Sequence, residues 1–133
     1  MKKTFFFIII FLLTLSCSLD RSNPLDIDNY PSKVLGIQVS RLENNKITIT
    51  WNTQGHEDDD GYFIYRSMLY DGFYVLLEPP DGITPSSTGF YEDEYIGEWY
   101  YYKMSAYRII DSKKLEGYRS IPKTWHNEPS EPR

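Results

Sequence analysis

Apolar and polar residues alternate with a period of two through much of the central part of the chain. The alternation is clearest over residues 46–51, where Ile47, Ile49 and Trp51 occupy one set of positions and threonines the other. Successive side chains of a β-strand point to opposite faces of its sheet. We therefore expect these three apolar residues to face a core and the threonines to face solvent.

Six further segments have the same character and predict strands. They are rich in β-branched and aromatic residues, and clusters of Gly, Asn, Asp and Pro separate them. These strands are expected at residues 34–40, 61–66, 73–77, 89–92, 99–107 and 116–120. Tyr62 and Ile64 are the expected inward pair of their strand. No long stretch has apolar residues at helical spacing, so the pattern predicts an all-β sandwich of seven antiparallel strands.

The beginning of the chain has a different pattern. Met1 and two lysines precede an apolar run over residues 5–13, and small residues then lead to Cys17, the only cysteine. The run is too short to span a bilayer, which takes about 20 residues. These features predict a signal peptide over residues 1–16 and lipid attachment at Cys17. An unpaired thiol or an intermolecular disulfide is the alternative, but neither explains why the cysteine ends the apolar run.

Residues 14–17 resemble the bacterial lipobox, in which a small residue precedes the acylated cysteine. Ser16 fits the motif, whereas Thr14 and Leu15 depart from it. The resemblance implies a lipoprotein of the cell envelope, and stable anchoring takes two or more acyl chains. Ser18 is not the aspartate that favours inner-membrane retention in enteric bacteria, so the outer membrane is the expected location.

Composition divides the remaining chain into three zones. Residues 17–30 are polar, contain Asn23-Pro24 and predict a tether. Residues 31–120 contain the predicted strands and form the expected domain. Residues 121–133 contain three prolines among charged residues and predict an extended tail.

The charge of the chain limits its partners. The 133 residues carry 14 basic and 19 acidic side chains, a net charge of −5, and removal of a leader containing Lys2 and Lys3 would leave about −7. A phosphate backbone would be repelled, so nucleic acid is not an expected partner. A single cysteine also leaves the domain without a disulfide, and the aromatic residues, 17% of the chain, must supply much of the buried surface.

The order of motifs along residues 31–120 is more specific than their composition. A strand ending in a tryptophan is followed by an acidic loop, Gly61-Tyr62-Phe63-Ile64-Tyr65-Arg66-Ser67, Tyr91-Glu92-Asp93 and the aromatic run 99–107. This order resembles a bacterial fibronectin type III domain, an immunoglobulin-like fold. The resemblance implies that Trp51 packs across the core and that Tyr100 forms the tyrosine corner, with its hydroxyl bonded to upstream backbone.

The same resemblance assigns the two faces of the strand at 99–107. Tyr102, Met104 and Ala106 would face inward. It also makes this strand a neighbour of 61–66, so four rings would project from one solvent face: Phe63, Tyr65, Tyr101 and Tyr107. A group of exposed aromatic rings usually marks a partner surface. The alternatives are that the tail covers the rings, with Trp125 folding back, or that cross-strand pairs only stabilise the sheet.

Glu57, Asp58, Asp59 and Asp60 form the densest acidic run. Clustered carboxylates are the ligands that calcium prefers, but consecutive residues do not easily converge on one ion and the spacing is not a calcium motif. We expect a solvated turn, with a weak cation site as the alternative.

No arrangement of residues points to catalysis. His56 and His126 have no metal-ligand spacing, and no nucleophile elbow of the form G-x-S-x-G is present. We therefore expect a membrane-anchored binding or scaffolding protein without a cofactor, not an enzyme. Its expected partner is a protein. A carbohydrate bound on Tyr and Trp rings, or a structural role in an envelope complex, is the alternative.

Overall fold

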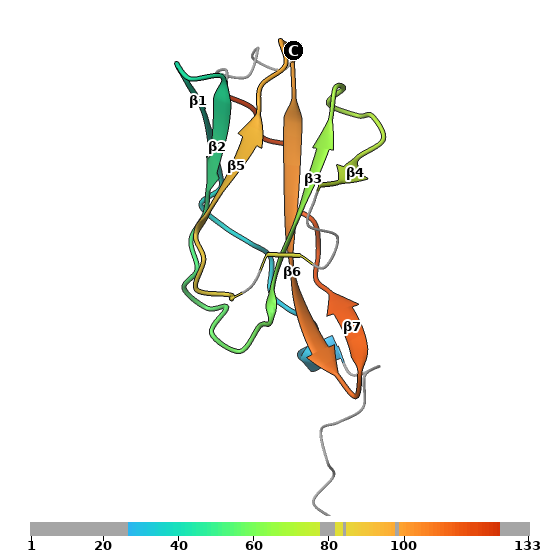
Figure 1. Cartoon of the computed structure of the whole chain (residues 1–133). Coiled ribbons are helices and arrows are strands. Elements are labelled where there is room, and N and C mark those ends of the chain that lie inside the picture. The colour runs from blue at the N-terminus through green and yellow to red at the C-terminus, as the bar shows by residue number, and fades with distance from the viewer. Residues whose placement is uncertain (1–26, 78–81, 84, 98, 126–133) are drawn as a thin grey trace, which may run out of the picture.

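Seven antiparallel strands form two sheets in the computed structural model, which describes residues 27–77, 82–83, 85–97 and 99–125 (Figure 1). The first sheet has the order β1-β2-β5, and its strands are β1 (Gln38–Leu42), β2 (Lys46–Thr50) and β5 (Phe90–Glu94). The second sheet has the order β4-β3-β6-β7, and its strands are β4 (Val75–Leu76), β3 (Gly61–Ser67), β6 (Tyr101–Ile110) and β7 (Lys113–Glu116). A short 3-10 helix, η1 (Ile27–Asn29), precedes them.

The all-β prediction is confirmed, but the strand bounds differ from the expectation: the strand expected at 73–77 is reduced to β4, the one expected at 99–107 continues to Ile110, and the first and last strands are displaced. The first strand begins only at Gln38, because Gly36 has a positive φ of 68° that interrupts extended backbone. The last strand lies at Lys113–Glu116 and not at 116–120, because Asp111 and Ser112 both have positive φ, 50° and 63°. This is the conformation of a tight type I′ hairpin turn, so β6 continues to the turn and β7 returns at once.

One core lies between the two sheets. It contains Ile47 and Ile49 of the first sheet and inward residues of β3 and β6 from the second, and each of them is almost fully buried: Tyr62, Ile64, Tyr102, Met104 and Ala106. The expected core residues Trp51 and Tyr100 lie in the same cluster. Trp51 meets the ring of Tyr62 edge-on at 5.2 Å between centroids, so it packs across the core. The tyrosine-corner hydrogen bond of Tyr100 stays a prediction.

The chain after β7 continues along β6 without forming a regular strand. The backbone nitrogens of Gly117, Ser120 and Lys123 donate to the carbonyl oxygens of Ala106, Met104 and Tyr102 at 2.9, 2.7 and 2.8 Å. Trp125 then packs against the main core. Residues 121–125, expected in the tail, therefore lie against the domain, whereas 126–133 with His126 fall outside the described residues.

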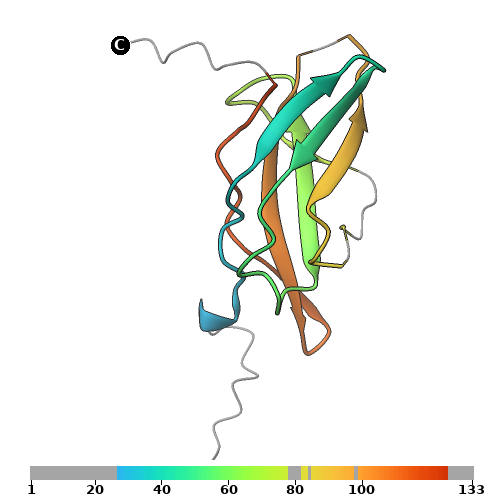
Figure 2. The same ribbon diagram turned by 90° about the vertical axis from the view of Figure 1, so that its left-hand side faces the viewer.

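The two ends of the described chain lie at opposite ends of the domain. η1 lies at the same end of the domain as the β6–β7 hairpin, and the segment that reaches Trp125 ends at the other end (Figures 1 and 2). The predicted signal peptide, Cys17 and residues 18–26 of the predicted tether lie outside the described residues. Residues 27–30, also expected in the tether, instead form η1 and the turn that leads into the domain. Within the described ranges, no helix has the length and apolar character needed to cross a bilayer.

Candidate functional site

The four rings expected to form an exposed partner surface share one face of the second sheet. The register of β3 against β6 places them there, since Tyr65 pairs with Lys103 and Phe63 with Ser105. However, Phe63 and Tyr65 are each 6% exposed and Tyr107 is 2% exposed. The expected exposure is therefore wrong for these three rings, and only Tyr101 is half-buried.

Cationic side chains cover these rings. Arg119 lies over Tyr65, with Cζ 3.8 Å from the ring centroid, and Lys114 Nζ lies 4.8 Å from the centroid of Tyr107. Lys103 Nζ lies 4.3 Å from the centroid of Tyr74, which joins the same aromatic cluster. A cation is attracted to the face of an aromatic ring, so the arrangement stabilises the sheet and leaves few rings for a partner. Trp125 does fold back, but onto the main core and not onto this face.

Glu116 is the polar centre of this face, a role that no pattern in the sequence predicts. Its Oε1 accepts hydrogen bonds from the Tyr65 hydroxyl at 2.7 Å, the Ser105 hydroxyl at 2.7 Å and Arg119 Nε at 3.0 Å. Burial raises the pKa of Glu116, but these hydrogen bonds outweigh it and the pKa is lowered. Burial and the bond to Glu116 raise the pKa of Tyr65 to about 12.

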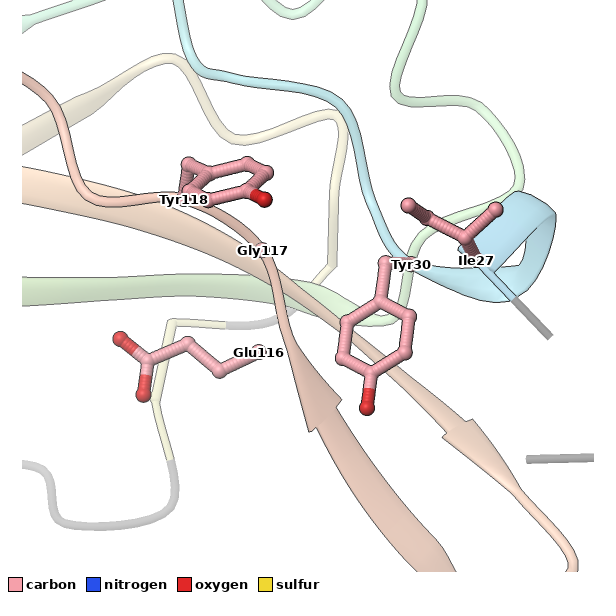
Figure 3. A pocket seen from close by; sticks show the side chains of 5 residues that line it. All are labelled: Ile27, Tyr30, Glu116, Gly117 and Tyr118. Carbon is pink, nitrogen blue, oxygen red and sulfur yellow. The ribbon is translucent and has the colours of Figure 1, made fainter. Parts of the chain in front are cut away.

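An open pocket of about 380 Å³ lies where η1 meets the end of β7 (Figure 3). Its lining residues are Ile27, Tyr30, Glu116, Gly117 and Tyr118. Ile27 and Tyr118 are 75% and 78% exposed, which is high for side chains of this size. Figure 3 shows the two tyrosine rings on either side of the chain at Gly117.

Gly117 fixes how the N-terminal segment meets the domain. A Cβ atom at residue 117 would lie 2.6 Å from the carbonyl oxygen of Pro31, closer than real Cβ contacts. Only glycine therefore allows the two backbones to approach in this way. Pro31 is buried by the contact, so the chain is held to the domain at this point.

The predicted acidic loop does not gather its carboxylates. Asp59 is buried, its Oδ2 lies 2.7 Å from His56 Nδ1, and its Oδ1 accepts from Arg108 Nη2 at 2.8 Å. Asp60 Oδ2 accepts from the backbone nitrogen of Ile109 at 2.6 Å.

Glu57 is likewise engaged within the loop, where its Oε1 accepts from the backbone nitrogen of Gly55 at 3.1 Å. These pairings join the loop to β6 and direct its carboxylates to different groups. Among the residues that the structure describes, no group of three or more His, Cys, Asp and Glu side chains is placed to hold a metal ion.

A buried polar contact connects the two sheets near the other end of the domain. Asp93 of β5 accepts two hydrogen bonds from Arg66 Nη1, at 3.0 and 2.8 Å, and one from the Tyr102 hydroxyl at 2.7 Å. Arg66 also lies over the ring of Tyr100, with Cζ 4.5 Å from its centroid. Burial and the bond to Asp93 raise the pKa of Tyr102.

Exposed apolar side chains gather beside this contact, where β3 passes into β4. Met68, Leu69, Phe73 and Val75 are all exposed, Phe73 by 87%, and they line one open pocket of about 430 Å³ together with Arg66 and Tyr100. We call these four residues the apolar loop surface. The sequence analysis did not predict this surface, because a strand predicted at 73–77 does not by itself indicate that Phe73 and Val75 are exposed. The available signal was the apolar pair Met68-Leu69 between two predicted strands.

Comparison with known proteins agrees with an all-β domain of two antiparallel sheets. No protein-family model matches the sequence, and no curated protein is detectably similar to it. Solved structures do match: one is an Fn3-like protein from Clostridium thermocellum, with a TM-score of 0.50 and 20% sequence identity over 73% of this chain and 95% of that one. At this identity the likeness concerns the fold alone, and it supports a fibronectin type III-like domain.

Proposed function

We propose that this protein is a lipid-anchored, non-catalytic binding module of the bacterial cell envelope. Cys17 carries the lipid, residues 18–26 form the tether, and a fibronectin type III sandwich contacts a partner protein through the apolar loop surface. The observation that carries the proposal is the position of the apolar loop surface at the end of the domain opposite η1 (Figures 1 and 2).

The length of the domain determines how far the apolar loop surface lies from a membrane anchor. β6 has ten residues, and at about 3.4 Å per residue it is about 34 Å long. A chain anchored before η1 would therefore hold the apolar loop surface about one strand length from the bilayer, where it faces other envelope proteins.

The chemistry of the apolar loop surface favours a protein partner. Four neighbouring apolar side chains in water are a typical partner surface, and Arg66 at its edge belongs to a residue type enriched in binding hot spots. The carbohydrate alternative requires exposed Tyr and Trp rings, and it has less support because Tyr65 and Tyr107, which were expected on an exposed face, are buried.

Site-specific crosslinking in cells tests the proposal. A photoreactive residue at Phe73 should give discrete protein adducts, whereas one at Phe90, an exposed residue of the other sheet, should not. The adducts should disappear with L69D. A palmitate analogue should label the wild-type chain but not C17A. Equal crosslinking from both positions, or labelling that persists in C17A, would contradict the corresponding part of the proposal.

A further inference from the structure

The end of the domain opposite the apolar loop surface carries its own exposed apolar and aromatic side chains. Ile27, Tyr30 and Tyr118 surround the open pocket beside η1 (Figure 3). The close contact between Gly117 and Pro31 holds the segment with Ile27 and Tyr30 against the segment with Tyr118. We call these three residues the entry surface, since the chain enters the domain here.

We propose that the entry surface inserts into the interface of the lipid bilayer and holds the domain upright. This inference rests on the proposed lipid anchor and adds the orientation of the domain. We infer that the membrane contacts this surface because the chain between the lipid anchor and the described domain is short. Nine residues lie between Cys17 and Ile27, and random-coil scaling gives their span as about 17 Å. The anchor therefore keeps the entry surface at the bilayer, whereas the apolar loop surface lies a strand length farther away.

The residue types fit the interface region of a bilayer. Tyrosine has an apolar ring and a hydroxyl that stays hydrated, and it is enriched at the level of lipid headgroups. Two tyrosines and an isoleucine at one end of the domain provide three points of contact, which fix an orientation where a single point would leave the domain free to tilt.

The charged residues at this end of the domain do not favour anionic over neutral bilayers. Lys113 and Lys114 lie on the hairpin beside the entry surface, but Asp111 and Asp28 lie there as well. Opposite charges at similar positions largely cancel in their attraction to anionic headgroups. The contact should therefore form equally on neutral and anionic bilayers and should change little with salt, unlike a polybasic membrane contact.

A single fluorescent label can report the contact. Cys17 is the only cysteine and is blocked when acylated, so an introduced cysteine is the one reactive thiol in the mature chain. We would label Y118C and, separately, I27C with an environment-sensitive nitrobenzoxadiazole dye. F73C, in the apolar loop surface, is the matched control because Phe73 is also highly exposed. The acylated proteins are reconstituted into phosphatidylcholine vesicles that contain spin-labelled phosphatidylcholine as a quencher.

The expected result is several-fold stronger quenching at residues 118 and 27 than at residue 73, unchanged when phosphatidylglycerol is added. A Y30S substitution should reduce quenching at residue 118. Equal, weak quenching at all three positions in protein that still floats with the vesicles would overturn the entry-surface contact and leave the anchor intact. Acylated protein that fails to float would overturn both. Loss of quenching on addition of a soluble polysaccharide would show that a sugar, not lipid, occupies the pocket.

Discussion

The hydroxyl of Tyr102 in β6 donates a 2.7 Å hydrogen bond to the carboxylate of Asp93 in β5, so one buried polar contact joins the two sheets. Arg66 donates to the same carboxylate from β3. Strands β3, β5 and β6 thus meet at one buried carboxylate. A buried donor or acceptor that loses its partner destabilises the folded state more than the bond itself stabilised it.

Substitutions at this contact should distinguish the loss of one hydrogen bond from the loss of the shared acceptor. Y102F removes one donor but leaves Asp93 with Arg66, and should lower the free energy of unfolding by about 1 kcal/mol. D93A leaves both donors without their acceptor and should cost about 3 kcal/mol. Urea denaturation measures both. E92A is the control, because Glu92 is exposed and pairs with the exposed Lys46, an interaction expected to contribute under about 1 kcal/mol. D93A and E92A of equal stability would contradict the prediction.

Glu116 should make the free energy of unfolding decrease at acid pH. Its pKa is lowered in the folded protein, so the stabilisation is complete above its unfolded pKa and is lost as pH falls through the folded pKa. E116Q keeps a hydrogen-bond acceptor but cannot titrate. Its urea midpoint should therefore change less between about pH 6 and pH 3 than that of the wild type, given an unperturbed glutamate pKa of about 4.3. Parallel pH profiles for the two proteins would argue against this role.

Gly117 should tolerate no larger side chain. G117V would drive a Cβ atom into the backbone of Pro31 and should destabilise the domain by about 2 kcal/mol, within the range of overpacking. It should also expose the segment around Tyr30 to limited proteolysis. The control is I121V, because Ile121 follows closely in the same segment and is 55% exposed, so the loss of one methylene there should change stability little. An unchanged proteolysis pattern in G117V would show that the contact does not hold the N-terminal segment.

Calcium should leave the melting temperature unchanged. Both carboxylate oxygens of Asp59 are occupied by His56 and Arg108, and Asp60 accepts from a backbone amide, so binding an ion would break existing bonds. Scanning calorimetry with calcium and with a chelator checks this. A rise in melting temperature with calcium that D58N abolishes would instead establish a cation site in the loop.

Local patterns were sufficient to predict the core but not the surface. The period-two alternation that places Ile47 and Ile49 inward is a property of one strand, so it can be read from the sequence. Whether the opposite face of a strand meets solvent depends on what covers it. Arg119 covers Tyr65 of β3 and comes from a segment far from β3 in the sequence. Lys114 covers Tyr107 of β6 and lies across the hairpin turn, on β7. The sequence of β3 alone therefore does not indicate that the outer face of this strand is covered.

The position of the last strand also differs from the prediction for a local reason. The turn at Asp111 and Ser112 contains no glycine and so lacks a strong hairpin signal, although both residues have positive φ. The segment after β7 bonds to β6 at every third residue or so and lacks regular strand conformation. Such pairing depends on the position of β6, and the sequence of the segment alone does not specify it.

The opposite positions of η1 and Trp125 determine how the domain would respond to mechanical load. A pull between these two points acts along the strands, and the hydrogen bonds that join residues 113–123 to β6 run across that direction. They would be sheared together and not opened one after another. Because bonds loaded in shear break together, we expect the domain to resist extension between these two points more strongly than extension across its sheets.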